Sequence, residues 1–158
     1  MRKEAMLGEI SALAEYFERS TRVLTEADSA YAPQEGMFTT AQVVAHVAQT
    51  VDWFIAGAFA PEGFSMDFEK MDKEVRAVTS LDHARMWFAR AIAKAKAAVE
   101  EKPESEWHAP LPPGPIMSGL PRAAVLGACT DHTAHHRGAL TVYSRMLGKV
   151  PPMPYMEM

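Results

Sequence analysis

The sequence predicts an all-α protein, built as a four-helix bundle with longer connections between the second and third helices and between the third and fourth. Four long stretches repeat apolar residues every three or four positions, which is the period of an α-helix with one buried face. Proline and glycine residues separate these stretches, and both residue types end helices. We therefore expect residues 1–158 to form a single domain, because a chain of this length buries roughly 68–70 % of its unfolded surface in one core.

The first helix is predicted over residues 3–24. Glutamate and arginine residues stand between its apolar positions, so that one face is apolar and the others are charged. Residues 25–36 contain aspartate, serine, proline and glycine, a composition typical of a connection. The apolar positions of this helix are Met6, Ile10, Leu13, Phe17 and Leu24.

The second helix, predicted over residues 39–60, has the clearest start signal. Thr39 is a good N-cap, and Gln42 three positions later completes a capping box. Pro61 ends the helix. Its apolar residues form one main stripe and a second, narrower stripe that contains His46, which predicts a helix buried on more than one face.

The remaining sequence alternates between connections and helices. Residues 61–79 have a weak pattern and are expected to form a connection with a short helical turn, packing its aromatic side chains on the core; the alternative is that they line a pocket at the mouth of the bundle. The third helix is predicted over residues 80–102. Residues 103–119 contain a proline cluster, which prevents a helix through the cluster and favours an extended crossing. The fourth helix is predicted over residues 121–147.

Composition excludes several classes of partner. The formal net charge is −4 and no run of lysine and arginine occurs, which argues against nucleic-acid binding. Cys129 is the single cysteine, so that neither an intramolecular disulfide nor a cysteine-based zinc site is expected. No apolar stretch reaches membrane-spanning length, and the charged first residues lack a signal-peptide apolar segment. We expect a cytoplasmic protein that does not bind a membrane.

A pair of histidines in the fourth predicted helix is the strongest chemical signal. His132 and His136 are four positions apart, which places both imidazoles on one helical face with Cβ atoms about 5–6 Å apart. They fall within the apolar stripe that runs from Val125 to Met146. Burying an imidazole without a partner costs on the order of 1–3 kcal/mol, and a metal ion would satisfy both rings. The alternative is that they bond to backbone carbonyls or to each other.

His46 would add a third nitrogen if the second and fourth helices were neighbours. Three protein ligands with further positions open is the catalytic pattern for zinc, although nickel, copper and ferrous iron also accept nitrogen ligands. A zinc protease would carry glutamate directly after the first histidine of such a pair, and here Thr133 takes that place. Asp131 could orient a histidine or face solvent, and His135 could contact a substrate.

These residues carry a resemblance to a known family. His46 in the run Val-Val-Ala-His, the segment from residue 132 to 140 and the closing run over residues 147–152 resemble the DinB superfamily of four-helix-bundle metalloenzymes, related to bacillithiol transferases and mycothiol-dependent isomerases. Ala139 departs from the family's usual glutamine. The resemblance implies that His46, His132 and His136 bind a divalent metal, often zinc or nickel, and that the protein is frequently a homodimer.

Two hypotheses about function follow. In the first, the protein is a metal-dependent enzyme that uses a low-molecular-weight thiol or water as nucleophile, and the residues walling its pocket include Trp53, Phe54 and Tyr143. Transfer of the thiol sulfur to an electrophile is the favoured reaction, and metal-dependent hydrolysis is the alternative. In the second, a structural metal only fixes the helices of a non-catalytic dimeric binding or stress-response module. A fourth protein ligand, such as His135 or His108, would favour the second hypothesis.

Overall fold

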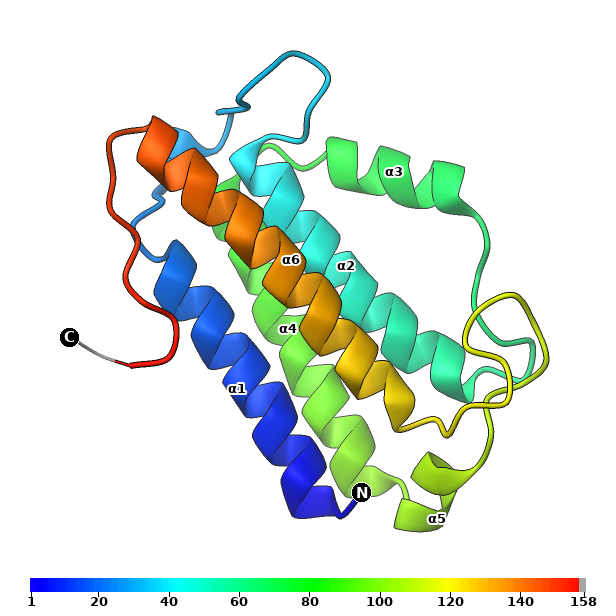
Figure 1. The fold of residues 1–158 in the computed structure, drawn as a ribbon. Coiled ribbons are helices and arrows are strands. Elements are labelled where there is room, and N and C mark those ends of the chain that lie inside the picture. The colour runs from blue at the N-terminus through cyan, green and yellow to red at the C-terminus, as the bar shows by residue number, and fades with distance from the viewer. Residues whose placement is uncertain (157–158) are drawn as a thin grey trace.

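A computed structural model describes residues 1–156, so that the last two residues of the predicted domain lie outside the described part. The described residues form six α-helices and one 3-10 turn, with no strand among them, which confirms the all-α prediction. Four long helices make the bundle, and two short helices lie at its side and at one end (Figure 1). The elements are α1 (Lys3–Thr21), η1 (Glu26–Asp28), α2 (Thr40–Phe59), α3 (Phe68–Arg76), α4 (Leu81–Glu101), α5 (Glu104–His108) and α6 (Ala124–Met146).

The helix α2 is the most enclosed element of the bundle. It packs against α4 and α6, and α3 covers part of its remaining surface. Val44 and Val47 are fully buried, and Val43 and Val51 are each 3 % exposed. The helix α2 is therefore buried on more than one face, as the sequence predicts. No helix in residues 1–156 combines the length and the apolar character needed to cross a membrane.

The predicted capping box starts α2. The backbone N–H of Gln42 donates to Thr39 Oγ1 at 3.3 Å, and the backbone N–H of Thr39 donates to Gln42 Oε1 at 3.0 Å. These two bonds satisfy donors that the first turn of a helix leaves free. The capping box thus sets the start of α2, and with it the position of His46 almost two turns later.

The helix α3 is longer than the short turn that the sequence predicts for residues 61–79. Asp67 caps it by accepting from the backbone N–H of Lys70 at 3.1 Å. Ion pairs between residues four positions apart support it, among them Lys73 with Glu69 at 2.6 Å. Phe68, Met71 and Val75 stand at positions i, i+3 and i+7, which is a helical spacing, although only Val75 is buried. This spacing and the spacing of opposite charges were the available signals.

Residues 103–119 also differ in part from the extended crossing that the sequence predicts. Pro103 precedes the short helix α5, whose Trp107 is fully buried. The proline cluster that follows is non-helical, as predicted, but its two ends meet, because Pro110 and Pro121 form an isolated bridge and the backbone N–H of Leu111 donates to the carbonyl of Leu120 at 2.8 Å. The segment is therefore a loop that returns to its start and not an extended crossing, and the burial of Trp107 fixes the helix before it.

Candidate metal centre

Three histidines from two helices meet between α2 and α6. Each offers one ring nitrogen, and these nitrogens all lie within 4.8 Å of one another. His46 Nε2 lies 3.2 Å from His132 Nε2. The ring centroid of His136 is 4.8 Å from that of His46 and 4.4 Å from that of His132. The helices α2 and α6 are neighbours, so that the condition under which His46 adds a third nitrogen is met, and the three candidate residues lie together.

The pair on α6 lies at the edge of the buried face and not in its middle. His132 and His136 are half-buried, whereas Thr133 is only 2 % exposed. Met146, which the predicted stripe includes, is 57 % exposed, and Ser144 is buried instead. The Ser144 hydroxyl can be buried because it donates to the backbone carbonyl of Leu140 at 2.9 Å. Four residues of the predicted stripe are buried as expected, whereas the two histidines and Met146 are more exposed than a place within that stripe predicts; the buried residues are Val125, Cys129, Leu140 and Tyr143.

The histidines are neutral at physiological pH. Burial, reinforced by repulsion from His46 and His135, lowers the pKa of His132 to about 4. Burial and the three neighbouring histidines lower the pKa of His136 to about 3. Burial also lowers the pKa of His46, an effect that Asp72 of α3 partly opposes. Neutral imidazoles keep a lone pair for a metal ion, so that no proton has to leave before binding.

The observed geometry fits a divalent metal. Two nitrogens bound at about 2.0–2.1 Å to one tetrahedral ion lie roughly 3.4 Å apart, close to the 3.2 Å between His46 Nε2 and His132 Nε2. The alternative of bonds to backbone carbonyls is not observed for His132, whose Nδ1 is buried without a partner among the described residues. His132 therefore has only another imidazole as a polar neighbour, an arrangement that a shared cation would satisfy.

The other candidate ligands stay outside the cluster. His135 is exposed, with its ring centroid 4.8 Å from that of His136, and it is not part of the close group of donor atoms. Asp131 is exposed as well. His108 lies on α5 and contacts the amino group of Met1. Within residues 1–156, the group of possible ligands therefore holds three histidines and no fourth side chain.

An aromatic cluster continues along α2 from the histidines. The Trp53 ring centroid is 4.9 Å from those of Phe54 and Phe64, and its indole N–H donates to the backbone carbonyl of Ser65 at 2.8 Å. Trp53 lies seven positions after His46, about 10.5 Å along the helix axis. The segment before α3 is thus anchored against α2 on the same side as the three histidines.

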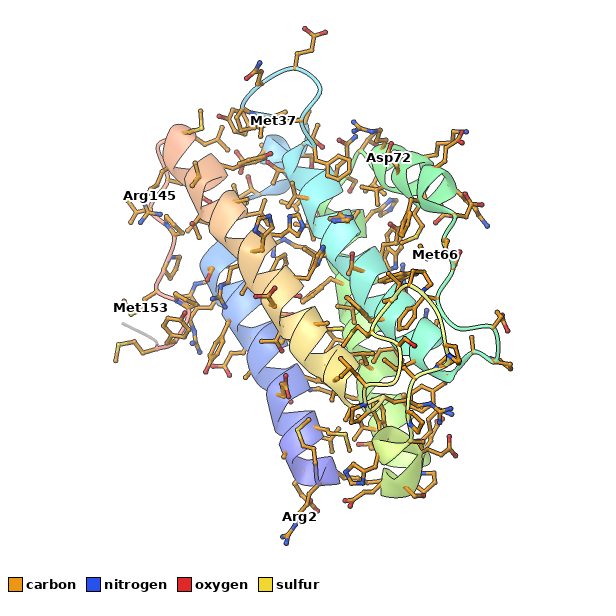
Figure 2. The ribbon with its side chains drawn as sticks, turned by 45° about the vertical axis from the view of Figure 1, so that its right-hand side comes forward. Arg2, Met37, Met66, Asp72, Arg145 and Met153 are labelled. Atoms are coloured by element: carbon orange, nitrogen blue, oxygen red, sulfur yellow. The ribbon has the colours of Figure 1, made fainter. Side chains whose placement is uncertain are left out.

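Tyr143 does not serve as the predicted pocket wall. Its side chain is 5 % exposed, and its hydroxyl donates to the backbone carbonyl of Phe38 at 2.9 Å. Sequence reasoning also missed Asp72, the carboxylate of α3 that acts electrostatically on His46. Figure 2 shows Asp72 on α3, the short helix beside α2. The helical spacing of Phe68, Met71 and Val75 and the spacing of the charges could have indicated a helix here, but not its packing beside His46.

The sequence and the fold were both compared with known proteins. The model of the DinB family matches residues 4–158. None of the curated proteins matches the sequence. A solved structure of a conserved protein from Enterococcus faecalis is similar with a TM-score of 0.66 and 16 % identity, over 94 % of this chain and 99 % of that one.

Two further solved structures share the fold. The mycothiol-dependent maleylpyruvate isomerase gives a TM-score of 0.66 at 16 % identity, over 89 % of this chain and 61 % of that one. The DinB-like protein YjoA of Bacillus subtilis gives 0.62 at 18 % identity, over 99 % of this chain and 98 % of that one. At these identities the similarity concerns the helical fold.

Proposed function

The chain belongs to the DinB family, and from this premise we propose that it is a metal-dependent enzyme whose divalent ion is held by His46, His132 and His136. The observation that carries the proposal is the group of three ring nitrogens within 4.8 Å, without a fourth protein ligand among residues 1–156. A structural zinc site is usually closed by four protein ligands, whereas a catalytic site keeps a position open. The open position is where a substrate or a nucleophile would bind.

Zinc or nickel is the proposed metal. Three neutral imidazoles suit either ion, and both are divalent ions that nitrogen ligands bind well. When bound, such an ion lowers the pKa of a thiol or a water molecule and so supplies a nucleophile at neutral pH. The chain itself contributes the fixed positions of the rings, which two packed helices hold, and a half-buried setting that excludes part of the solvent.

The favoured reaction is transfer of the sulfur of a low-molecular-weight thiol to an electrophilic carbon. The thiol loses its proton to solvent, the sulfur forms a new bond to that carbon, and a leaving group, chloride in the case of 1-chloro-2,4-dinitrobenzene, departs with the electron pair of its broken bond to the same carbon. Thr133 stands where a zinc protease would carry its general base, so that activation of water lacks the usual glutamate. A thiol has a lower pKa than water and needs less help. The fold shared with a mycothiol-dependent isomerase supports a thiol as the cosubstrate.

Two alternatives stay open to experiment. A metal-dependent hydrolase would use the same ligands with water as nucleophile. A non-catalytic module would use the ion only to join α2 and α6.

For all three functions we propose a homodimer in the cytoplasm, a reducing compartment that suits a free, buried Cys129. Exposed apolar side chains on α6, Val142 at 55 % and Met146 at 57 %, support a dimer contact on that helix.

The decisive experiment combines metal content with turnover. Untagged protein, purified without chelators, is assayed by elemental mass spectrometry and then incubated with 1-chloro-2,4-dinitrobenzene and either bacillithiol or mycothiol. We expect one zinc or nickel ion per chain and thioether formation that is lost in His136→Ala. Ester hydrolysis without thioether formation would support the hydrolase. A loaded protein inactive in both assays would support the module, and a protein that binds no metal would contradict all three.

A further inference from the structure

A groove separate from the histidine cluster lies between α4 and residues 77–79, the segment that follows α3. Its volume is about 370 Å³. Val78, Met86 and Trp87 contribute its apolar surface, and His83 and Arg90 are its ionisable side chains. None of the three clustered histidines lines it. Volumes of this size are typical of sites for small organic ligands.

A hydrogen bond and a neighbouring ion pair fix the position of Trp87 in this groove. The indole N–H of Trp87 donates to Asp52 Oδ2 at 2.8 Å, and Lys94 pairs with the same carboxylate at 3.3 Å. The indole is therefore fixed at its polar edge. Beside it, Met86 is 57 % exposed. A fixed indole and a polarisable thioether together form a surface on which a flat aromatic ring can pack.

The charge of the groove is cationic. The chain has 20 acidic and 16 basic residues, yet no carboxylate lines the groove. The guanidinium of Arg90 makes no ion pair or hydrogen bond with any side chain or backbone group of residues 1–156. An arginine without a carboxylate partner offers its planar fork of N–H groups to an external anion.

The spacing on α4 gives the size of the ligand. His83, Trp87 and Arg90 are separated by four and three positions, so that they follow one another along a single face of the helix. From His83 to Arg90 the helix rises about 10 Å.

We propose that this groove binds a small aromatic anion, with its ring on Trp87 and Met86 and its carboxylate or sulfonate at Arg90. This site is independent of the function proposed for the histidine cluster.

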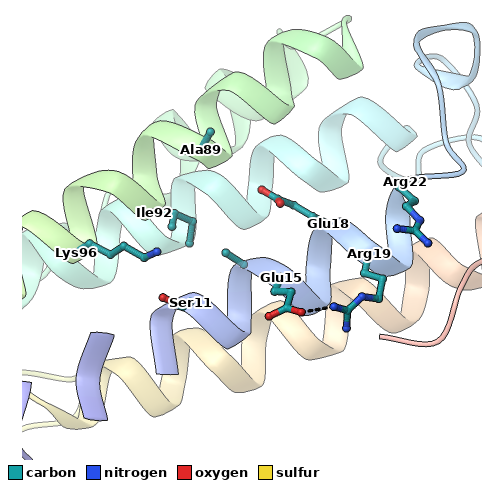
Figure 3. A pocket seen from close by; sticks show the side chains of 9 residues that line it. Ser11, Glu15, Glu18, Arg19, Arg22, Ala89, Ile92 and Lys96 are labelled. Carbon is teal, nitrogen blue, oxygen red and sulfur yellow. Dashed lines mark hydrogen bonds and ion pairs between the residues drawn. The ribbon is translucent and has the colours of Figure 1, made fainter. Parts of the chain in front are cut away.

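A second groove on the opposite side of α4 provides the contrast. It lies between α1 and α4, with a volume of about 530 Å³, and Figure 3 shows its lining. Both signs of charge meet there, since Glu15 pairs with Arg19 and Glu18 lies beside them. No aromatic residue lines it. Lys96 projects from α4 into this groove, which makes it a matched control for Arg90 on the same helix.

The test uses 2-naphthoate as the probe and the intact protein as purified. Isothermal titration calorimetry should show saturable binding of one naphthoate per chain. Arg90→Gln should raise the Kd about tenfold or more, because a charge-assisted hydrogen-bonded pair is lost. Lys96→Gln should leave the Kd unchanged, and so should His136→Ala, which excludes binding of the carboxylate at the metal. Naphthalene-2-methanol, which has the ring without the charge, should bind more weakly.

Nuclear magnetic resonance locates the probe. The protein has three tryptophan indole N–H groups, and the signal that disappears in Trp87→Phe identifies Trp87. We expect naphthoate to shift that signal more than the other two. No saturable binding at millimolar probe, an unchanged Kd in Arg90→Gln, an equal loss in Lys96→Gln or a larger shift at another indole would each overturn the proposal.

Discussion

His46 Nε2 on α2 lies 3.2 Å from His132 Nε2 on α6, although 86 positions separate the two residues in the chain. No backbone group contributes to this contact, and the rings meet at an interplanar angle of 65°. Two neutral imidazoles can share only one hydrogen bond between facing nitrogens, whereas a cation between them could accept a lone pair from each. Metal binding, its dependence on pH and the acid stability of the metal-free protein depend on this contact.

Loss of the third ring should abolish metal binding. His136→Ala leaves only two nitrogens, and we expect elemental mass spectrometry to find almost no zinc or nickel in this variant and in His46→Ala. His83→Ala, which removes an exposed histidine of α4, is the control and should keep its metal. One ion per chain at unchanged affinity in His136→Ala would show that the site assignment is wrong.

Metal affinity should be insensitive to pH over a wider range than for ordinary histidines. The pKa values of about 4 for His132 and about 3 for His136 mean that protons compete with the metal only in acid. We expect a constant zinc affinity from neutral pH to below the ordinary histidine pKa, because burial lowers the pKa of His46 as well, and a decrease as the pH falls further toward the pKa of His132. Competition titrations with a zinc indicator at several pH values test this. A decrease that begins near the ordinary histidine pKa of 6.5 would contradict it.

The metal-free protein should lose stability in the same acidic range. Burial lowers the pKa of His132 from 6.5 to about 4, so that the unfolded chain takes up a proton that the folded protein does not bind. The free energy of unfolding should therefore be highest above pH 6.5 and should fall as the pH drops toward 4. Urea unfolding at a series of pH values measures this, and His132→Gln should show a shallower decrease. Equal slopes in the two proteins would exclude His132 as a cause.

Gly57 is required where the aromatic cluster crosses α2. A Cβ atom at this position would lie 2.2 Å from the Phe64 ring, so that the ring would have to move. We expect Gly57→Ala to lower the free energy of unfolding by about 1–3 kcal/mol. Gly138→Ala is the matched control, because a Cβ there meets nothing within 4 Å, and alanine should raise the stability of α6 by about 0.5–1 kcal/mol. A stabilising Gly57→Ala in urea unfolding would show that Phe64 does not pack as described.

The segments that the sequence predicted poorly are the two short helices. The helix α3 has helical spacing at Phe68, Met71 and Val75, but these three apolar positions span only two turns among charged residues, and only Val75 is buried. The helix α5 is shorter still, and it forms where Trp107 enters the core. Local preferences decide little in such segments, because the burial of one side chain against distant residues outweighs them.

By itself, the sequence determined the four long helices, the capping box of Thr39 and Gln42 and the pairing of His132 with His136 on one face. These features depend on residues within a few positions of one another, and the backbone geometry of a helix is enough to place them. The tertiary structure alone decided that α2 packs beside α6 and that His46 lies next to the histidine pair of α6. It also decided that the three imidazole rings are half-buried. Those outcomes depend on how whole helices rotate and pack to bury apolar surface, which is a property of the assembled bundle.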